Sequence, residues 1–261
     1  MTTGTSRPPI DTGRPHPARV YDFLLGGKDN YPVDQAVAEH LPAEARAGAF
    51  QQRAFMHRAT AWLAGEGVDQ FLDIGTGIPT APNLHQIAQG IVPSARVVYC
   101  DNDPIVLRHA EALLISSPEG ATDYVHADVR EPGTIIEAAH EVLDFGRPVA
   151  LSLLGLLHFL PDAEDPYGIV RTLTATLAPG SYVALSQGAS DVNPEGGEQG
   201  TEEYGKGGIQ LALRTRAEFG RFFEGLGLVE PGLVTAPEWF RSAPAPKPEF
   251  SGMYVGVARV R

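Results

Sequence analysis

Four polar residues recur in this chain at nearly constant intervals, and three of them are aspartates. Asp73, Asp101, Asp128 and His158 are separated by 28, 27 and 30 residues. A strand with its following helix takes about 30 residues, so each of the four falls near the end of one strand in successive strand–helix units. In an open parallel sheet these strand ends meet at one edge, where ligands bind. The spacing therefore predicts a ligand site lined by three carboxylates.

The stretch FLDIGTGIPT, residues 71–80, runs from an apolar strand into a glycine turn. Gly75 and Gly77 allow the main chain to approach a ligand closely. The third glycine of the dinucleotide pattern G-x-G-x-x-G is absent, because Thr80 takes its place. Asp73 would repel a pyrophosphate but suits a ligand with a cationic amine. Taken alone, Asp73 could also be an aspartate that caps its own turn.

The two later aspartates suit the other parts of a nucleoside. A carboxylate at the end of the second strand can accept hydrogen bonds from both hydroxyls of a ribose, and Asp101 is in that place. Asn102 and Asp103 follow it and fit a turn with a helix N-cap. Asp128 would meet an adenine amino group if the ligand lies along the same edge. Its alternative role is a turn residue before Pro132.

His158 is the candidate catalytic residue. It follows the fourth strand and could take a proton from an acceptor hydroxyl or amine. The alternative, which the sequence leaves equally open, is a histidine packed against the ligand or bonded to the main chain. The sequence holds no H-E-x-x-H motif and no paired cysteines, so it gives a metal site no support.

The elements that would position these residues alternate between strand and helix. We expect a doubly wound, mostly parallel, Rossmann-like α/β sheet of seven strands. The first five strands are predicted at residues 71–74, 96–100, 123–127, 149–154 and 181–186, and the last two, at 228–234 and 254–260, as an antiparallel hairpin at one edge. Helices are predicted over residues 43–63 and from Pro104, Pro166 and the capping box Thr215-x-x-Glu218.

The N-terminal part should cover the site. Residues 1–18 read as a loose arm, and residues 1–66 as an arm with a helical cap before the Rossmann-like domain at 67–261. Tyr21, Lys28, Asn30 and Tyr31 surround the turn at Gly26-Gly27 and are candidates for a flap over the ligand, or for an ordinary helical turn packed on the sheet. Residues 187–208 contain seven glycines and predict a mobile lid or a disordered segment.

Composition limits the partners. The formal net charge of −12 and the pI of about 5.1 disfavour nucleic acid and anionic membranes. The longest apolar run, residues 148–161, is too short for a membrane span, and the polar, Pro-rich start shows no signal peptide. Cys100 is the single cysteine, which fits a reducing cytoplasm. The oligomeric state cannot be read from the sequence.

Several motifs carry a resemblance to known proteins. FLDIGTG, VVYCDNDP, YVHADVRE and LLGLLHFLPD, in this order, resemble the successive motifs of class I S-adenosylmethionine-dependent methyltransferases. With RPHPARVYDFLLGGKDNYPVD and LAPGSYVALS, the chain resembles a bacterial, largely actinobacterial family. That family was first catalogued as a domain of unknown function and is now called S-adenosyl methyltransferase. The resemblance covers nearly the whole chain and implies a methyl donor, but no particular acceptor.

The resemblance also implies roles for individual residues. Asp73, Gly75 and Gly77 would surround the methionine part of S-adenosylmethionine, and Asp101 would hold the ribose hydroxyls. Asn102, Asp128 and the Val129 main chain would meet the adenine, and the segment from Gly155 to His158 would line the reactive side of the donor. The segment Ile78-Pro79-Thr80 departs from the family, where many relatives have another small residue, and this loosens the expected loop geometry.

Three functions remain open at this stage. The first is methyl transfer from S-adenosylmethionine to a small-molecule acceptor, with no nucleic acid or membrane as partner. The second is a non-catalytic module that binds S-adenosylmethionine. The third is an NAD-dependent oxidoreductase, against which no tyrosine here is followed by lysine four positions later.

Overall fold

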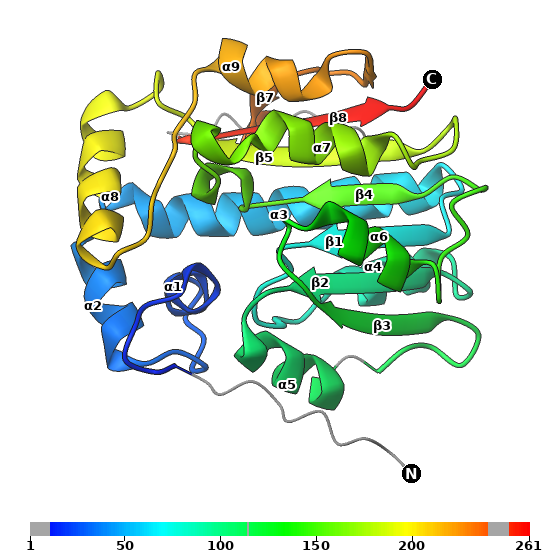
Figure 1. The fold of residues 1–261 in the computed structure, drawn as a ribbon, viewed down its shortest axis with the longest axis horizontal. Helices are drawn as coiled ribbons and strands as arrows, with labels where there is room; N and C mark the ends of the chain where they lie inside the picture. Colours follow the sequence, from blue (N-terminus) through cyan, green and yellow to red (C-terminus); the bar gives the residue numbers. More distant parts are fainter. Residues whose placement is uncertain (1–10, 114, 240–250) are drawn as a thin grey trace.

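The protein is built around one twisted, mostly parallel sheet (Figure 1). The computed structural model describes residues 11–113, 115–239 and 251–261. The sheet has the order β3-β2-β1-β4-β5-β8-β6, with β7 also paired to β8. The strands are β1 (Gln70–Ile74), β2 (Arg96–Asp101), β3 (Ala121–His126), β4 (Ala150–Leu153), β5 (Tyr182–Gly188), β6 (Gly227–Leu228), β7 (Val234–Thr235) and β8 (Met253–Arg259). β1 to β5 are parallel, and β8 is antiparallel to its neighbours.

The sheet has eight strands, so the prediction of seven is wrong by one. The difference arises in residues 228–234, which were expected to form one strand. Pro231 has no N–H to donate, and Gly232 takes a positive φ of 86° in a turn closed on Val229. The segment is therefore divided into the short β6 and β7, both antiparallel to β8.

Helices cover both faces of the sheet. They are α1 (Pro17–Leu24), α2 (Pro32–His40), α3 (Glu44–Gly65), α4 (Leu84–Ile91), α5 (Pro104–Leu113), α6 (Pro132–Ala139), α7 (Pro166–Thr174), α8 (Pro194–Lys206) and α9 (Arg216–Gly220). α3 and α4 pack on one face, and α6 and α7 on the other, as Figure 1 shows. Successive side chains of β1 alternate between these two apolar layers, which places Asp73 on the face of α3 and α4.

Local sequence signals explain most helix starts. The Asp165 carboxylate accepts a hydrogen bond from the Gly168 N–H at 2.9 Å, and Asp103 accepts one from the Ile105 N–H at 3.0 Å. Thr215 and Glu218 form the expected capping box, but α9 ends after five residues and passes into the 3₁₀ turn η3 (Arg221–Phe223). No helix in the described ranges is both long enough and apolar enough to cross a membrane.

A cap of three helices covers the carboxyl ends of the parallel strands. In Figure 1 the parallel strands point towards the side where α1, α2 and α8 lie. These helices share a small apolar cluster made by Val20, Val37, Ala38 and Tyr204. Of the predicted loose arm, residues 1–10 lie outside the described residues, and Pro17 already begins α1.

Residues 187–208 are more ordered than the sequence indicated. β5 extends to Gly188, and α8 occupies residues 194–206 despite four glycines within it. Asn193 caps α8 by accepting a hydrogen bond from the Gly196 N–H, and Pro194 takes the first helical turn. Packing of Tyr204 against α1 and α2 supplies the stability that the local sequence lacks. The alternative of disorder is wrong for residues 194–206, because it weighed composition without this tertiary contact, and a mobile lid stays a prediction.

Candidate functional site

A cavity of about 630 Å³ lies between the strand ends and the helical cap. Its lining includes the loop after β1, the end of β2, the segment after β4, and residues of α1, α3 and α8. This size is typical of sites that bind a cofactor or a small molecule. The cavity is therefore at the edge that the spacing of the polar residues indicated.

Asp73 is a buried carboxylate in this cavity. Its neighbour in β4, Ser152, donates a hydrogen bond from Oγ to Asp73 Oδ1 at 2.5 Å. Burial raises the pKa of Asp73 to about 6, although Ser152 and the nearby Arg53 act in the opposite direction. A carboxylate held in this environment gains from a cationic group placed beside it.

The two glycines after Asp73 shape the turn. Gly75 and Gly77 have positive φ angles of 74° and 68°, which residues other than glycine rarely adopt. A Cβ atom on Gly75 would also lie 2.9 Å from Leu156 Cδ2. The Gly75 N–H donates to the Cys100 carbonyl at 2.8 Å, which ties the turn to β2. The loop therefore brings main chain to the cavity, and a side chain at Gly75 would both strain the backbone and crowd Leu156.

Asp101 is fixed by main-chain donors on both carboxylate oxygens. Oδ2 accepts from the Gly77 N–H at 2.8 Å, and Oδ1 accepts from the Asp103 N–H at 3.0 Å. Burial raises the pKa of Asp101, and His16 and these hydrogen bonds oppose the rise. Each oxygen keeps a second acceptor position, so the carboxylate can still receive two hydroxyl hydrogen bonds from a ligand.

The adenine-side residues divide into two groups. Asn102 and Val129 line the cavity, whereas Asp128 is not among the lining residues. The Asp128 carboxylate accepts a hydrogen bond from Asn102 Nδ2 at 2.8 Å. Arg130 also binds Asp128, at 3.2 Å, and binds Glu164 at 2.7 Å. Burial raises the pKa of Asp128, but the hydrogen bonds from Arg130 and Asn102 outweigh it and bring the pKa below its usual value. In this arrangement Asp128 orients Asn102 and Arg130.

His158 lies in the 3₁₀ turn η1 (Leu157–Phe159) and lines the cavity. Its side chain is buried, and Nδ1 has no hydrogen-bond partner within the described chain. Burial, followed by the charge of Arg214, lowers the pKa of His158 to about 4. The imidazole is therefore uncharged at neutral pH. Gly155, three residues earlier, also lines the cavity and donates its N–H to Ser186 Oγ at 2.7 Å.

The four predicted flap residues are not brought together. Tyr21 lines the cavity and donates from its hydroxyl to the Ala49 carbonyl at 3.1 Å. Lys28, Asn30 and Tyr31 are not among the lining residues. Lys28 is exposed, Asn30 Nδ2 donates to the Asp22 carboxylate at 2.8 Å, and Tyr31 precedes α2. These three residues contribute to the turn that joins α1 to α2, and a flap role for them stays a prediction.

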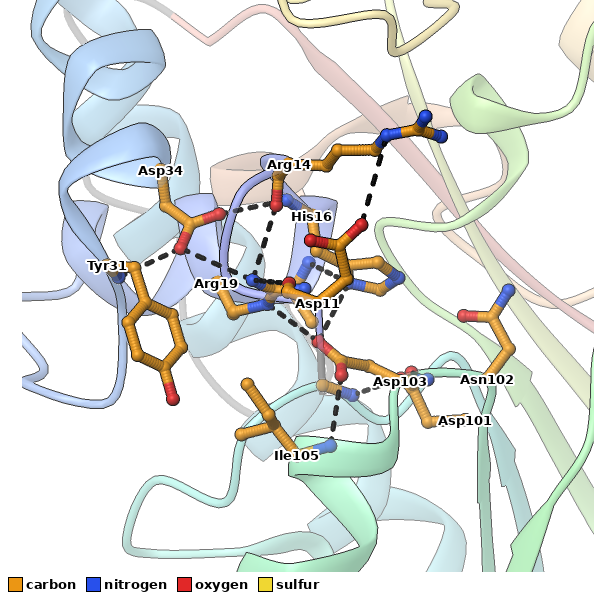
Figure 2. Close-up of polar contacts among 12 residues, drawn as sticks. Asp11, Arg14, His16, Arg19, Tyr31, Asp34, Asp101, Asn102, Asp103 and Ile105 are labelled. Atoms are coloured by element: carbon orange, nitrogen blue, oxygen red, sulfur yellow. Dashed lines mark hydrogen bonds and ion pairs between the residues drawn. The ribbon is translucent and has the colours of Figure 1, made fainter. Parts of the chain in front are cut away.

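A buried ion pair fastens the cap to the sheet, as Figure 2 shows. Arg19 of α1 donates from Nε to Asp103 Oδ2 at 2.9 Å, and its Nη1 is 3.8 Å from the Asp34 carboxylate. His16 Nδ1 lies 3.3 Å from the same Asp103 oxygen. Asp103 is only two residues after Asp101 in the sequence. The contact between Arg19 and Asp103 therefore places α1 beside the candidate ribose site.

Sequence reasoning missed several residues of the cavity wall. His16, Gln52 and Arg53 line the cavity, and none belongs to a glycine loop or a strand end. Gln52 and Arg53 lie on α3, for which the sequence predicted a helix over residues 43–63 but no site residue. Their place three and two positions before the apolar pair Phe55-Met56, at helical spacing, was the available signal.

Comparison with known families identifies the chain. The family signature described as S-adenosyl methyltransferase matches residues 3–261. The chain belongs to this family. It is thus an enzyme that uses S-adenosylmethionine as methyl donor, and its acceptor is unidentified. A search of proteins with curated functions returns no match.

Two solved structures closely resemble this S-adenosyl methyltransferase. A DUF574 family protein from Streptomyces avermitilis is 45% identical, with a TM-score of 0.93 over 97% of this chain and 100% of its own. A putative methyltransferase from Thermobifida fusca is 36% identical, with a TM-score of 0.87 over 99% of this chain and 100% of its own. The plantazolicin methyltransferase BpumL is 14% identical, with a TM-score of 0.55 over 94% of this chain and 96% of its own, and shows a shared fold.

Proposed function

We propose that the protein methylates a small, uncharged and largely apolar acceptor inside the cavity. The single observation that carries this proposal is the lining of the cavity away from Asp73 and Asp101. Apolar side chains of the cap and of the loops near it form that part of the wall: Leu24, Leu41, Phe159, Leu211, Leu213 and Met253. An apolar wall binds apolar ligand surface.

The cations of the lining argue against an anionic acceptor. Among the described lining residues, Arg53 and Arg130 are the permanent cations. Arg130 is already paired with Asp128 and Glu164, and Arg53 lies near Asp73. A phosphate or carboxylate at the α8 end would therefore be buried without a partner, which is costly. With a net charge of −12, the chain also disfavours nucleic acid as acceptor.

The residues of the sheet edge fit S-adenosylmethionine. Asp73 would bind the ammonium group, Asp101 the ribose hydroxyls, and Asn102 with the Val129 main chain the adenine. Gly75 and Gly77 would allow the main chain to approach the methionine part. When bound, S-adenosylmethionine supplies an activated methyl group on its sulfonium sulfur.

His158 would orient the acceptor. An imidazole with a pKa lowered to about 4 is a weak base at neutral pH, but it can still donate or accept a hydrogen bond. Alignment of the nucleophile and exclusion of water account for much of the rate of such a transfer. We also propose a cytoplasmic location, because the single cysteine, Cys100, is buried and has no second cysteine with which to form an internal disulfide.

The test uses isotope-labelled methyl groups. The protein is incubated with methyl-labelled S-adenosylmethionine and an extract of its host cell, which is then divided into small molecules and macromolecules. We expect label in a small product that passes into organic solvent at pH 7, and much less with Asp101→Asn. Label in RNA, protein or a charged product would contradict the proposed acceptor. His158→Asn should slow the transfer while leaving donor affinity within about threefold.

A further inference from the structure

Arg53 is a cation on the cavity wall with most of its hydrogen-bonding capacity free. It lies on α3, where it is half-buried, and its Nη2 donates to the Pro82 carbonyl at 2.9 Å. A guanidinium has five N–H donors. Within the described residues, no other hydrogen bond and no ion pair to Arg53 is formed. The bond to Pro82 fixes the end of the side chain and leaves other donors available to a ligand.

Arg53 and Asp73 face the same cavity without forming an ion pair. Each influences the pKa of the other, so they are electrostatically close. Their nitrogen and oxygen atoms nevertheless do not come within 4.0 Å. Burial lowers the pKa of Arg53, and the nearby Tyr21, Asp73 and Tyr99 oppose this change. Charged groups in a poorly solvated site are stabilised by groups of opposite charge. Because Arg53 and Asp73 do not pair with each other, each can bind an oppositely charged group of a ligand.

Asp73 is the carboxylate whose charge acts on the pKa of Arg53. Tyr21, which also lies near Arg53, has its pKa raised to about 12 by burial and is neutral at physiological pH. Tyr99 has its pKa raised by burial as well, and its hydroxyl is bonded to His85. The local pattern is one negative and one positive group, separated, on the wall beside the glycine turn.

We infer that Arg53 binds the carboxylate of the donor's methionine part while Asp73 binds its ammonium group. The two side chains would then select the zwitterionic amino acid end of the donor. The inference rests on the proposed binding of S-adenosylmethionine in this cavity and adds a residue that no motif of the sequence indicated. A guanidinium suits this task because it binds a carboxylate through two parallel hydrogen bonds.

Two donor molecules that differ in one group test this assignment. S-adenosylmethionine has both charges of the amino acid, whereas decarboxylated S-adenosylmethionine keeps the amine and lacks the carboxylate. Calorimetric titration of wild type should show the first binding about 10- to 100-fold more tightly, as expected for a charge-assisted contact. Arg53→Gln should remove this preference by weakening S-adenosylmethionine alone, and Arg53→Lys should restore part of it.

A matched control lies on the same helix. Arg46 of α3 is exposed and outside the cavity lining, so Arg46→Gln should change neither affinity. Thermal unfolding of each variant checks that the fold is kept.

The remaining outcomes distinguish failure of the role given to Arg53 from failure of the proposed function. Equal affinity of wild type for the two molecules, or equal weakening of both by Arg53→Gln, would overturn the role of Arg53 while leaving donor binding intact. Failure of wild type to bind either molecule would contradict the proposed function itself, and the inference would fall with it.

Discussion

The two walls of the cavity are held in place in different ways. On the sheet side, Asp101 is fixed by N–H groups of Gly77 and Asp103, which belong to the two loops at the ends of β1 and β2. On the cap side, α1 and α2 pack through apolar contacts on α8, which is distant from them in the sequence. The ion pair between Arg19 and Asp103 links α1 to the sheet side. The sheet wall is thus polar and built largely from local loops, and the cap wall depends on distant segments.

This difference matters for what each wall can do. Carboxylates held by main-chain amides keep one geometry, which suits recognition of a constant donor. A wall of helices joined by side-chain packing can change its lining through a few substitutions without disturbing the sheet. We expect donor recognition to reside in the sheet wall and in Arg53 of α3, and acceptor choice in the cap.

The largest expected effect is at the link between the walls. Arg19→Leu should lower the free energy of unfolding by about 3–5 kcal/mol, because it leaves the buried Asp103 carboxylate without its cation. Urea unfolding measures this change. Arg14→Leu is the control. The Arg14 side chain is 87% exposed, and its ion pair with Asp11, at 3.8 Å, is on the surface and contributes little to stability. Equal effects of the two variants would mean that apolar contacts alone hold the cap.

The sheet wall is tested next through donor affinity. Asp101→Asn should weaken binding of S-adenosylhomocysteine by about 1.5–3 kcal/mol, because a charge-assisted hydrogen bond to the ribose is lost. Titration calorimetry gives the value. Asp123→Asn, an exposed position on the neighbouring β3, should leave the affinity unchanged. An unchanged affinity for Asp101→Asn in a folded protein would remove Asp101 from the site.

A smaller effect is expected from the glycine turn. Gly75→Ala places a residue with a side chain at a φ of 74° and brings its Cβ to 2.9 Å from Leu156 Cδ2. The left-handed backbone alone should cost about 1–2 kcal/mol of unfolding free energy. Gly90→Ala in α4, where a Cβ would meet nothing within 4 Å, should instead stabilise by about 0.5–1 kcal/mol. Thermal or urea unfolding compares the pair, and similar effects would argue against a strained turn.

The smallest effect concerns pH. Asp73 has a pKa of about 6 in the folded protein, so it becomes protonated as the pH falls through that value and loses its attraction for an ammonium group. Donor affinity should be about tenfold lower at pH 5 than at pH 7.5. Asp73→Asn should bind more weakly at neutral pH with a flatter profile, in which Asp101, whose pKa is also raised, accounts for the remaining slope.

The effect of Asp73 on stability has the opposite sign. Its folded pKa lies above the unfolded value of 3.8, so the protonated form favours the folded state. Its contribution to stability is present below about pH 4 and is lost as the pH rises through about 6. Equal pH dependence of unfolding in wild type and Asp73→Asn would contradict this assignment.

The sequence predicted the sheet side well because its signals are local. Five parallel strands, the place of Asp73 and Asp101 at their ends, and the glycine turn follow from apolar runs, spacing and turn residues within short windows. The ends of the elements were predicted less accurately, as residues 228–234 show. Pro231 and Gly232 divide this segment, and the two short strands that result, β6 and β7, each pair with β8.

For the cap side, the sequence predicted N-terminal helices over the site, but only the tertiary structure decided that α8 joins them and how the three helices pack. The composition of residues 187–208 favours disorder, yet α8 forms because Tyr204 packs against helices about 170 residues earlier in the chain. The same holds for Arg53, whose helical position was readable but whose place beside Asp73 was not. Local patterns fix which residues end a strand or begin a helix. Which side chains from distant segments share a cavity depends on how the helices pack, and that information resides in contacts across the whole chain.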